Sequence, residues 1–422
     1  MYNKSKVKNV GYDQSENEHV DKDSRSKNSD SVSNTPAGRG RLLKLTGNTP
    51  AAIIDIMSQP PIRFDPNYRN PCFIGTDTNP LFKDGQLHCL PYFYLIGVKK
   101  SGTSDLFQRI SAHPEFRDPG FKEAQWFPRV RCGISTKPIE KRKPFRDSRR
   151  KGIDNRSIKF YISMFDDAAA SIQQCLSEDE EGRIYHNCVT AEATPANLHM
   201  HTGWKLLPGN EGLTEPRYTN FHYIKHITPG AKIIIIFRDP VTRLFSDFLH
   251  EMKIRGAQHT PSAKVAEKFH KQTSALMSAY RNCFNLYSMR RCIYNETLSR
   301  QLQKDGGILT DSFRAGFYAF YMQELLSVFS REQILTIHMA QYLTRAKQTL
   351  TDTFKYLNMS PLSSNEMSEI LNLKAANTAK SNATMNSETK DMLYKFYRPY
   401  NEKMASLMED STYLISAKLN RL

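Results

Sequence analysis

The sequence has no hydrophobic run long enough to cross a membrane. Its longest apolar stretches, 92–98 and 233–237, fall far short of the roughly 20 residues that a spanning helix needs. The residues that follow Met1 are polar, so no secretory leader is visible. If the protein works in the secretory pathway, we therefore expect an anchor or signal that is missing from this chain.

Metal-binding cysteine pairs are also missing. None of the seven cysteines stands in a CxxC pair, and no cluster of metal ligands is evident, so we predict no metal site. Six of them form pairs that are close in sequence and would each close a polar segment, namely Cys72 with Cys89, Cys175 with Cys188 and Cys283 with Cys292. These disulfides, with Cys132 left over, favour an oxidising compartment, and seven free thiols in the cytosol are the alternative.

Apolar residues are scarce at the N-terminal end. Residues 1–45 are mostly Lys, Asp, Asn, Ser and Glu, and such a segment buries too little apolar surface to offset the entropy lost on ordering. We predict that it is disordered. Residues 46–88 contain many Pro and Asn and are interpreted as an irregular lead-in. The folded domain is expected over 89–422.

The charge is strongly unbalanced. Lys and Arg number 59 against 43 acidic residues, a net charge of +16, which favours a polyanionic partner such as nucleic acid, an anionic membrane or an acidic polysaccharide. No aromatic-plus-glycine signature of RNA binding is present, so nucleic acid is not expected. The basic run 141–151 is either a grip for a polyanion or a solvated loop.

Hydrophobic patterning predicts strands that alternate with helices. Strands are expected at 92–98, at 231–237, which contains four consecutive isoleucines, and at 334–338. Helices are expected at 103–112, from Pro240 onward, and at 317–329, 344–357 and 387–408. The alternation predicts an α/β fold with a central, mainly parallel sheet flanked by helices, whose ligands bind at the carboxyl ends of the strands.

A glycine-bearing loop joins the first strand to the first helix. Gly97 and Gly102 frame four residues, so that backbone N–H groups and the helix N-terminus are able to hold an anion. A loop that hydrolyses ATP or GTP has Lys directly after its second glycine. Here that residue is Thr103, and the lysines come earlier, which argues against a kinase. An ordinary strand–helix turn with exposed lysines is the structural alternative.

Two segments together resemble one enzyme family. The loop 97–103 resembles the 5'-phosphosulfate loop of carbohydrate sulfotransferases, and 236–248 resembles their 3'-phosphate motif. The likeness runs from about Cys89 to about Leu407. Segments 90–97 and 122–127 are most similar to the N-acetylgalactosamine 4-sulfate 6-O-sulfotransferase type. The resemblance implies a P-loop-like sulfotransferase fold and a place in the Golgi lumen.

This resemblance implies an activity and an acceptor. The enzyme would transfer a sulfuryl group from 3'-phosphoadenylyl sulfate (PAPS) to a sugar hydroxyl of a glycosaminoglycan, the 6-hydroxyl of N-acetylgalactosamine 4-sulfate in chondroitin or dermatan sulfate. Heparan sulfate or another glycan as acceptor is the first alternative. A non-catalytic protein that binds polyanions is the second. Glycosylation sequons, which would suit a Golgi glycoprotein, begin at Asn155, Asn295, Asn358 and Asn382.

The family motifs assign residues to the donor site. Lys100 matches the loop lysine that stabilises charge on the leaving group, and Lys99 lies beside it. The donor's 5' end would also be held by the backbone of the following residues, Ser101, Gly102, Thr103 and Ser104. At the 3' end, Arg238 and Ser246 match the phosphate contacts, and Lys380 lies in a segment that resembles the loop closing over the nucleotide.

One carboxylate matches the base of related enzymes. Glu123, in the segment 121–127, occupies the position of the carboxylate that takes the acceptor's proton. A surface glutamate is the alternative. The segment from Glu192 to Pro195 resembles another active-site segment, but Ala193 stands where many relatives have Lys, which puts a second catalytic lysine in doubt.

Overall fold

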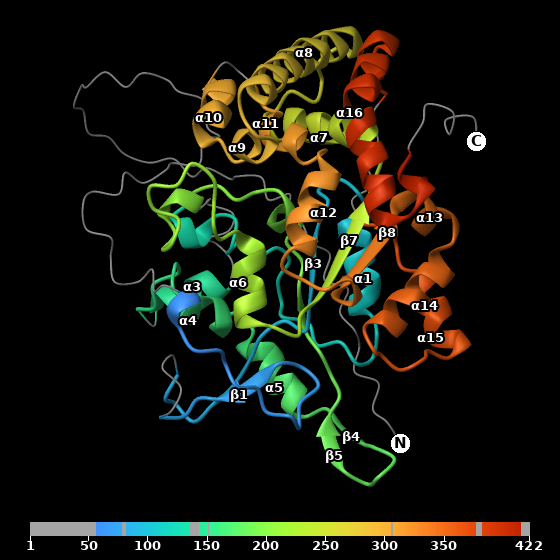
Figure 1. Ribbon diagram of the computed structural model, residues 1–422. Helices are drawn as coiled ribbons and strands as arrows, with labels where there is room; N and C mark the ends of the chain where they lie inside the picture. The colour runs from blue at the N-terminus through green and yellow to red at the C-terminus, as the bar shows by residue number, and fades with distance from the viewer. Residues whose placement is uncertain are drawn as a thin grey trace, which may run out of the picture. The chain divides into compact units, whose positions relative to one another are not determined.

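A four-stranded parallel sheet lies at the centre of the computed structural model (Figure 1). Its strand order is β6-β3-β7-β8, and the strands are β3 (Phe93–Gly97), β6 (Ala191–Glu192), β7 (Lys232–Phe237) and β8 (Ile334–His338). The three strands predicted from the sequence agree with β3, β7 and β8 within a residue, and β6 is an addition. The predicted α/β class with a parallel sheet is confirmed.

The structure describes residues 56–77, 82–134, 143–150, 152–304, 307–376 and 382–414. The segment 1–45 lies outside them, and so does Lys380. Within the lead-in 46–88, β1 (Cys72–Ile74) pairs antiparallel with β2 (Leu87–Cys89). A second antiparallel pair is formed by β4 (Leu176–Glu178) and β5 (Ile184–His186).

Alternate residues of the central strands face two separate hydrophobic clusters. On β7, Ile233 and Ile235 belong to a cluster that includes residues of α6 (Asn220–Ile227), α7 (Pro240–Ile254) and α12 (Tyr318–Leu326). Ile234 and Ile236 face the other cluster, which includes residues of α1 (Thr103–Ser111), α14 (Ala346–Tyr356) and α15 (Ser364–Leu371). Each of these isoleucines is fully buried, a gain of roughly 1.5–3 kcal/mol per side chain. Helices therefore cover both faces of the sheet.

The predicted helices are present with small changes at their ends. Asp239 caps α7 by accepting a hydrogen bond from the Thr242 backbone N–H at 2.7 Å. The helix predicted over 344–357 begins two residues later, at Ala346, as α14, and Thr344 is the last residue of a separate helix, α13 (Met339–Thr344). The remaining helices are α3 (Lys143–Arg150), α4 (Ile158–Ser163), α5 (Asp166–Gln173), α8 (Ser262–Leu286), α9 (Met289–Ile293), α10 (Glu296–Lys304), α11 (Thr310–Arg314) and α16 (Ser387–Met408).

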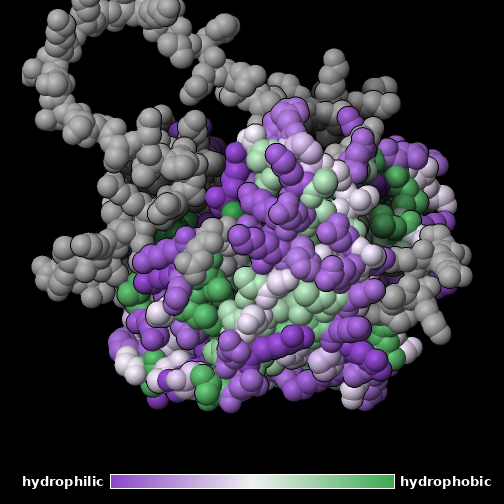
Figure 2. Space-filling view, turned by 90° about the horizontal axis from the view of Figure 1, so that it is seen from above, coloured by the Kyte–Doolittle hydropathy of each residue, from purple (hydrophilic) through white to green (hydrophobic). Residues whose placement is uncertain are grey.

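All three predicted disulfides are present, joining Cys72 to Cys89, Cys175 to Cys188 and Cys283 to Cys292. Cys132 is a free, buried thiol, and burial raises its pKa to about 11. Figure 2 looks onto the end of the molecule where α8 and α16 lie, and its surface there is mainly hydrophilic. In the described residues no helix is long and apolar enough to span a membrane.

Candidate active site

The turn between β3 and α1 has the geometry of an anion-binding loop. Gly102, the N-cap of α1, has a φ of 88°, a left-handed conformation that favours glycine. The first intrahelical bond of α1 runs from the Leu106 N–H to the Gly102 carbonyl at 3.0 Å. The N–H groups of Thr103 and Ser104 precede that bond, so helix geometry leaves them available to an anion.

The two lysines of this loop have different surroundings. The Lys99 Nζ forms ion pairs with Asp247 at 2.9 Å and Glu251 at 3.1 Å, both on α7. Burial opposes its charge, but these two carboxylates raise the pKa of Lys99. Lys100 has no hydrogen bond or ion pair from its ammonium within the described part of the chain. Burial, together with the charges of Lys99 and Arg238, lowers the pKa of Lys100, although the negative charge of Asp247 opposes this shift.

Arg238 connects the end of β7 to the loop 97–103, which the sequence predicts to bind the 5'-phosphosulfate and which is called the phosphate loop from here on. Its guanidinium donates to the Lys100 carbonyl at 3.2 Å and, through Nε, to the Thr242 hydroxyl at 3.3 Å. Burial lowers the pKa of Arg238, which still leaves the group charged at neutral pH. Ser246 lies two turns along α7 and is partly exposed. The predicted contacts for the two ends of the donor therefore lie on adjoining elements.

Glu123 lies next to the first turn of α1. Lys122 places its Nζ 3.2 Å from the Ser104 hydroxyl and 3.4 Å from Glu123 Oε1. The other oxygen of Glu123 accepts a hydrogen bond from the Gln125 side chain. The carboxylate predicted to act as a base is thus connected to the phosphate loop through one lysine. Lys122 stands directly before Glu123 but was not among the site residues predicted from the sequence.

A second carboxylate lies behind this segment. Glu192, at the end of β6, is buried and accepts hydrogen bonds from the Tyr161 hydroxyl at 2.8 Å and the Asn197 amide at 3.3 Å. Burial raises the pKa of Glu192, and the charge of Glu123 adds to the effect. The backbone N–H of Gln125 donates to the Thr194 hydroxyl at 3.2 Å. The segment that begins at Glu192 therefore supports the segment that carries Glu123.

Two further observations concern metal ligands and the position of a hollow. No group of three or more potential metal ligands occurs among the residues described. A small hollow lies away from the phosphate loop and contains none of the predicted site residues. It is lined by His201, Thr202, Trp204, Tyr294, Glu296, Ser299, Arg300, Gln303, Asp311 and Arg314.

A family comparison agrees with this geometry. Residues 91–298 match the model of the sulfotransferase family, and this span contains β3, the phosphate loop, β7 and all of α8. The chain is therefore similar to the sulfotransferase family over residues 91–298. The resemblance inferred from the two phosphate motifs is confirmed.

The chain is also similar to individual sulfotransferases. Carbohydrate sulfotransferase 15 from Mus musculus and from Homo sapiens are each 31% identical to this chain over 337 residues, which is 78% of this chain and 55% of the relative. The chain thus spans about half the length of these curated relatives. A solved sulfotransferase from Alicyclobacillus acidocaldarius is 19% identical, with a TM-score of 0.46 and coverage of 77% of this chain and 98% of that one.

Proposed function

We propose that this protein transfers a sulfuryl group from PAPS to a sugar hydroxyl of a glycosaminoglycan. The observation that carries the proposal is that Lys100, Arg238 and Glu123 are connected by contacts around the loop that follows β3. Lys100 is a cation without a partner among the described residues, and Arg238 donates to its carbonyl. Glu123 reaches the same helix terminus through Lys122. The site thus offers cations to an anionic donor and a carboxylate to an acceptor.

The reaction assigns one task to each group. The acceptor oxygen forms a bond to sulfur while the bond from sulfur to the bridging oxygen of the 5'-phosphate breaks, and 3',5'-ADP leaves with that electron pair. Lys100 stabilises the charge that grows on the bridging oxygen, which is stronger in the transition state than in the bound donor. The Glu123 carboxylate takes the proton of the acceptor hydroxyl.

The donor's two ends would be held by the two strand-end segments. The backbone of Ser101 to Ser104 would bind the 5'-phosphosulfate, and Arg238 and Ser246 would bind the 3'-phosphate. Lys380, predicted for the same phosphate, lies outside the described residues. Of the two loop lysines, we assign contact with the donor to Lys100, because Lys99 is paired with Asp247 and Glu251.

The proposed acceptor is N-acetylgalactosamine 4-sulfate in chondroitin or dermatan sulfate, modified at its 6-hydroxyl. The net charge of +16 supports an anionic partner, and similarity to proteins named carbohydrate sulfotransferase 15 supports a carbohydrate acceptor. We also propose residence in the Golgi lumen. Three disulfides favour an oxidising compartment, and exposed side chains at Asn358 and Asn382 leave two sequons accessible to glycosylation.

A transfer assay tests the proposal. The full chain, secreted from a eukaryotic host, is incubated with PAPS labelled in its sulfuryl group and a panel of desulfated and sulfated glycosaminoglycans. We expect label in chondroitin or dermatan sulfate, located at the 6-hydroxyl. Glu123→Gln should lower kcat about 10²–10⁴-fold, because the proton has no acceptor, whereas Glu369→Gln, an exposed carboxylate on α15, should leave it unchanged.

The acceptor panel distinguishes the alternatives. Transfer only to heparan sulfate or another glycan would contradict the proposed acceptor and keep the proposed reaction. Tight binding of glycosaminoglycans without any transfer, by a protein that does not bind 3',5'-ADP, would favour the non-catalytic polyanion binder.

A further inference from the structure

Asp247 is a buried carboxylate that the proposed reaction does not use. It follows Ser246 on α7, and its side chain is 1% exposed. Its Oδ1 lies 2.9 Å from the Lys99 Nζ, and its Oδ2 accepts a hydrogen bond from the Ser312 hydroxyl. An ionised carboxylate is costly to bury unless it is paired and hydrogen-bonded. Both conditions are met here, and the position of Asp247 is therefore closely fixed.

Further contacts hold Ser312, the hydrogen-bond donor of Asp247, in place. Arg243, one turn earlier on α7 and fully buried, donates to the backbone carbonyl of Ser312 at 2.5 Å. Ser312 belongs to α11, so a second helix supports the carboxylate. Although burial opposes ionisation, Lys99 and Arg243 lower the pKa of Asp247. The carboxylate is therefore ionised at neutral pH, and its fixed position holds the Lys99 ammonium in place.

The ion pair connects two elements that hold different ends of the proposed donor. Lys99 is part of the loop assigned to the 5'-phosphosulfate, whereas Asp247 is on the helix whose Ser246 is assigned to the 3'-phosphate. A second connection runs in parallel, from the Arg238 guanidinium to the Lys100 carbonyl. These two contacts join the segments assigned to the two proposed phosphate subsites.

We propose that Asp247 is a positioning residue that fixes the distance between the 5' and 3' subsites by holding Lys99. The inference rests on the proposed function, because it assumes that the donor occupies both subsites. It also explains why two adjacent lysines differ. The Asp247 carboxylate draws Lys99 toward α7, and Lys100, with no such partner among the described residues, is left for the donor.

Two nucleotides distinguish spacing from simple charge. 3',5'-ADP has a phosphate at each end and needs both subsites, whereas 5'-AMP needs only one. If Asp247 fixes the spacing, Asp247→Asn should weaken 3',5'-ADP far more than 5'-AMP. If Asp247 merely adds negative charge near the site, its removal should strengthen the binding of both anions. The two explanations predict changes of opposite sign for 3',5'-ADP.

Titration calorimetry on the full chain provides the measurement. We expect Asp247→Asn to raise the Kd of 3',5'-ADP about tenfold or more and that of 5'-AMP less than about threefold. Lys99→Gln, which breaks the same pair from the solvent-accessible side, should have a similar effect. The double variant should be no weaker than either single variant, since both remove one interaction. Glu369→Gln, which removes an exposed carboxylate on α15, is the control and should leave both affinities unchanged.

The outcomes separate this inference from the proposed function. A folded parent protein that does not bind 3',5'-ADP would contradict the proposed function itself. A parent that binds, with a folded Asp247→Asn variant that binds 3',5'-ADP equally or more tightly, would overturn the positioning role alone. Equal weakening of both nucleotides would overturn it too. Far-UV circular dichroism and thermal unfolding establish whether each variant is folded. If Asp247→Asn is not folded, Lys99→Gln decides the question by the same comparison of its affinities for 3',5'-ADP and 5'-AMP.

Discussion

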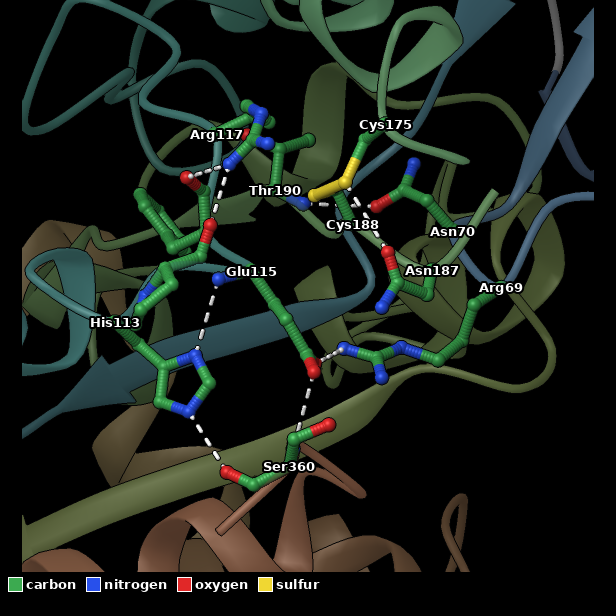
Figure 3. The surroundings of a disulfide bond; sticks show 12 residues. Arg69, Asn70, His113, Glu115, Arg117, Cys175, Asn187, Cys188, Thr190 and Ser360 are labelled. Atoms are coloured by element: carbon green, nitrogen blue, oxygen red, sulfur yellow. Dashed lines mark hydrogen bonds and ion pairs between the residues drawn. A yellow bond between two sulfur atoms is a disulfide. The ribbon is translucent and has the colours of Figure 1, made fainter. Parts of the chain in front are cut away.

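The charged side chains near the two ends of α1 differ in whether they are paired within the protein. At its N-terminus, Lys100 has no ion-pair partner in the described part of the chain, and Lys99 and Arg238 lie close to it. Beyond its C-terminus, Arg69 forms an ion pair with Glu115 at 2.8 Å, and the other oxygen of Glu115 accepts a hydrogen bond from the Ser360 backbone N–H at 3.2 Å (Figure 3). Roughly 13 Å of helix separates the two regions.

The C-terminal region is occupied by interactions within the protein. His113 contacts the Ser360 carbonyl at 3.1 Å, and Asn70 accepts from the Thr190 backbone N–H at 2.9 Å, close to the disulfide of Cys188 (Figure 3). These contacts pair the groups with one another and stabilise the fold. An excess of unpaired positive charge costs stability and is retained where an anion binds. We therefore propose that one end of the helix serves binding and the other serves stability.

Removing Lys100 should produce the largest effect and confine it to activity. Lys100→Ala is expected to lower kcat about 10²–10³-fold, because the charge on the leaving oxygen loses its cation. The free energy of unfolding should not fall, since the ammonium has no partner in the described residues and is near two other cations. Steady-state transfer assays and urea unfolding measure both quantities. Lys347→Ala, an exposed lysine on α14, is the control, and a large loss of stability in Lys100→Ala would contradict the comparison.

Removing the disulfide near the opposite end should lower stability instead. Replacing Cys175 and Cys188 together by serine is expected to cost about 2–4 kcal/mol of unfolding free energy, because the open chain gains entropy when unfolded. Values of kcat for the folded fraction should stay within about twofold of the parent. Urea unfolding with and without the pair measures the loss. A collapse of kcat in a variant that remains folded would show that the two regions are coupled.

Glu115 should have the smallest effect and a characteristic pH dependence. Burial opposes ionisation, but Ser360 and Arg69 lower the pKa of Glu115 from 4.5. The stability that this group contributes is therefore complete above its unfolded pKa and is lost as pH falls through its lower, folded value. Glu115→Gln should cost about 1–3 kcal/mol at pH 7, and the gap to the parent should narrow as the pH falls below 4.5. A gap that stays constant down to pH 3 would exclude this explanation.

Local sequence signals predicted the parts of the fold that local physics determines. Four consecutive isoleucines predicted β7, and the short spacing of Cys72 to Cys89 predicted their disulfide. The phosphate loop was predictable because its glycines, helix start and lysines are contiguous. By contrast, β6 has only two residues, which is too short for hydrophobic alternation to indicate a strand.

The contacts that distinguish the site residues were not predictable from sequence. The two loop lysines are adjacent, and only the packing of α7 against the loop determines that Lys99 meets Asp247. The contact between Lys122 and Ser104 likewise joins segments that are 18 residues apart. Pairings of this kind depend on tertiary structure, so a motif identifies Lys99 and Lys100 as candidates without assigning their separate roles.

A nucleotide-binding measurement tests the central claim most directly. The full chain is titrated calorimetrically with 3',5'-ADP, 5'-AMP and Mg-ATP. We predict that 3',5'-ADP binds most tightly, because it alone carries phosphates for both the loop before α1 and Arg238. Arg238→Ala should reduce its affinity to about that of 5'-AMP. A folded protein that prefers Mg-ATP, or that binds none of the three, would contradict the assignment of this edge of the sheet to a 3'-phosphorylated sulfuryl donor.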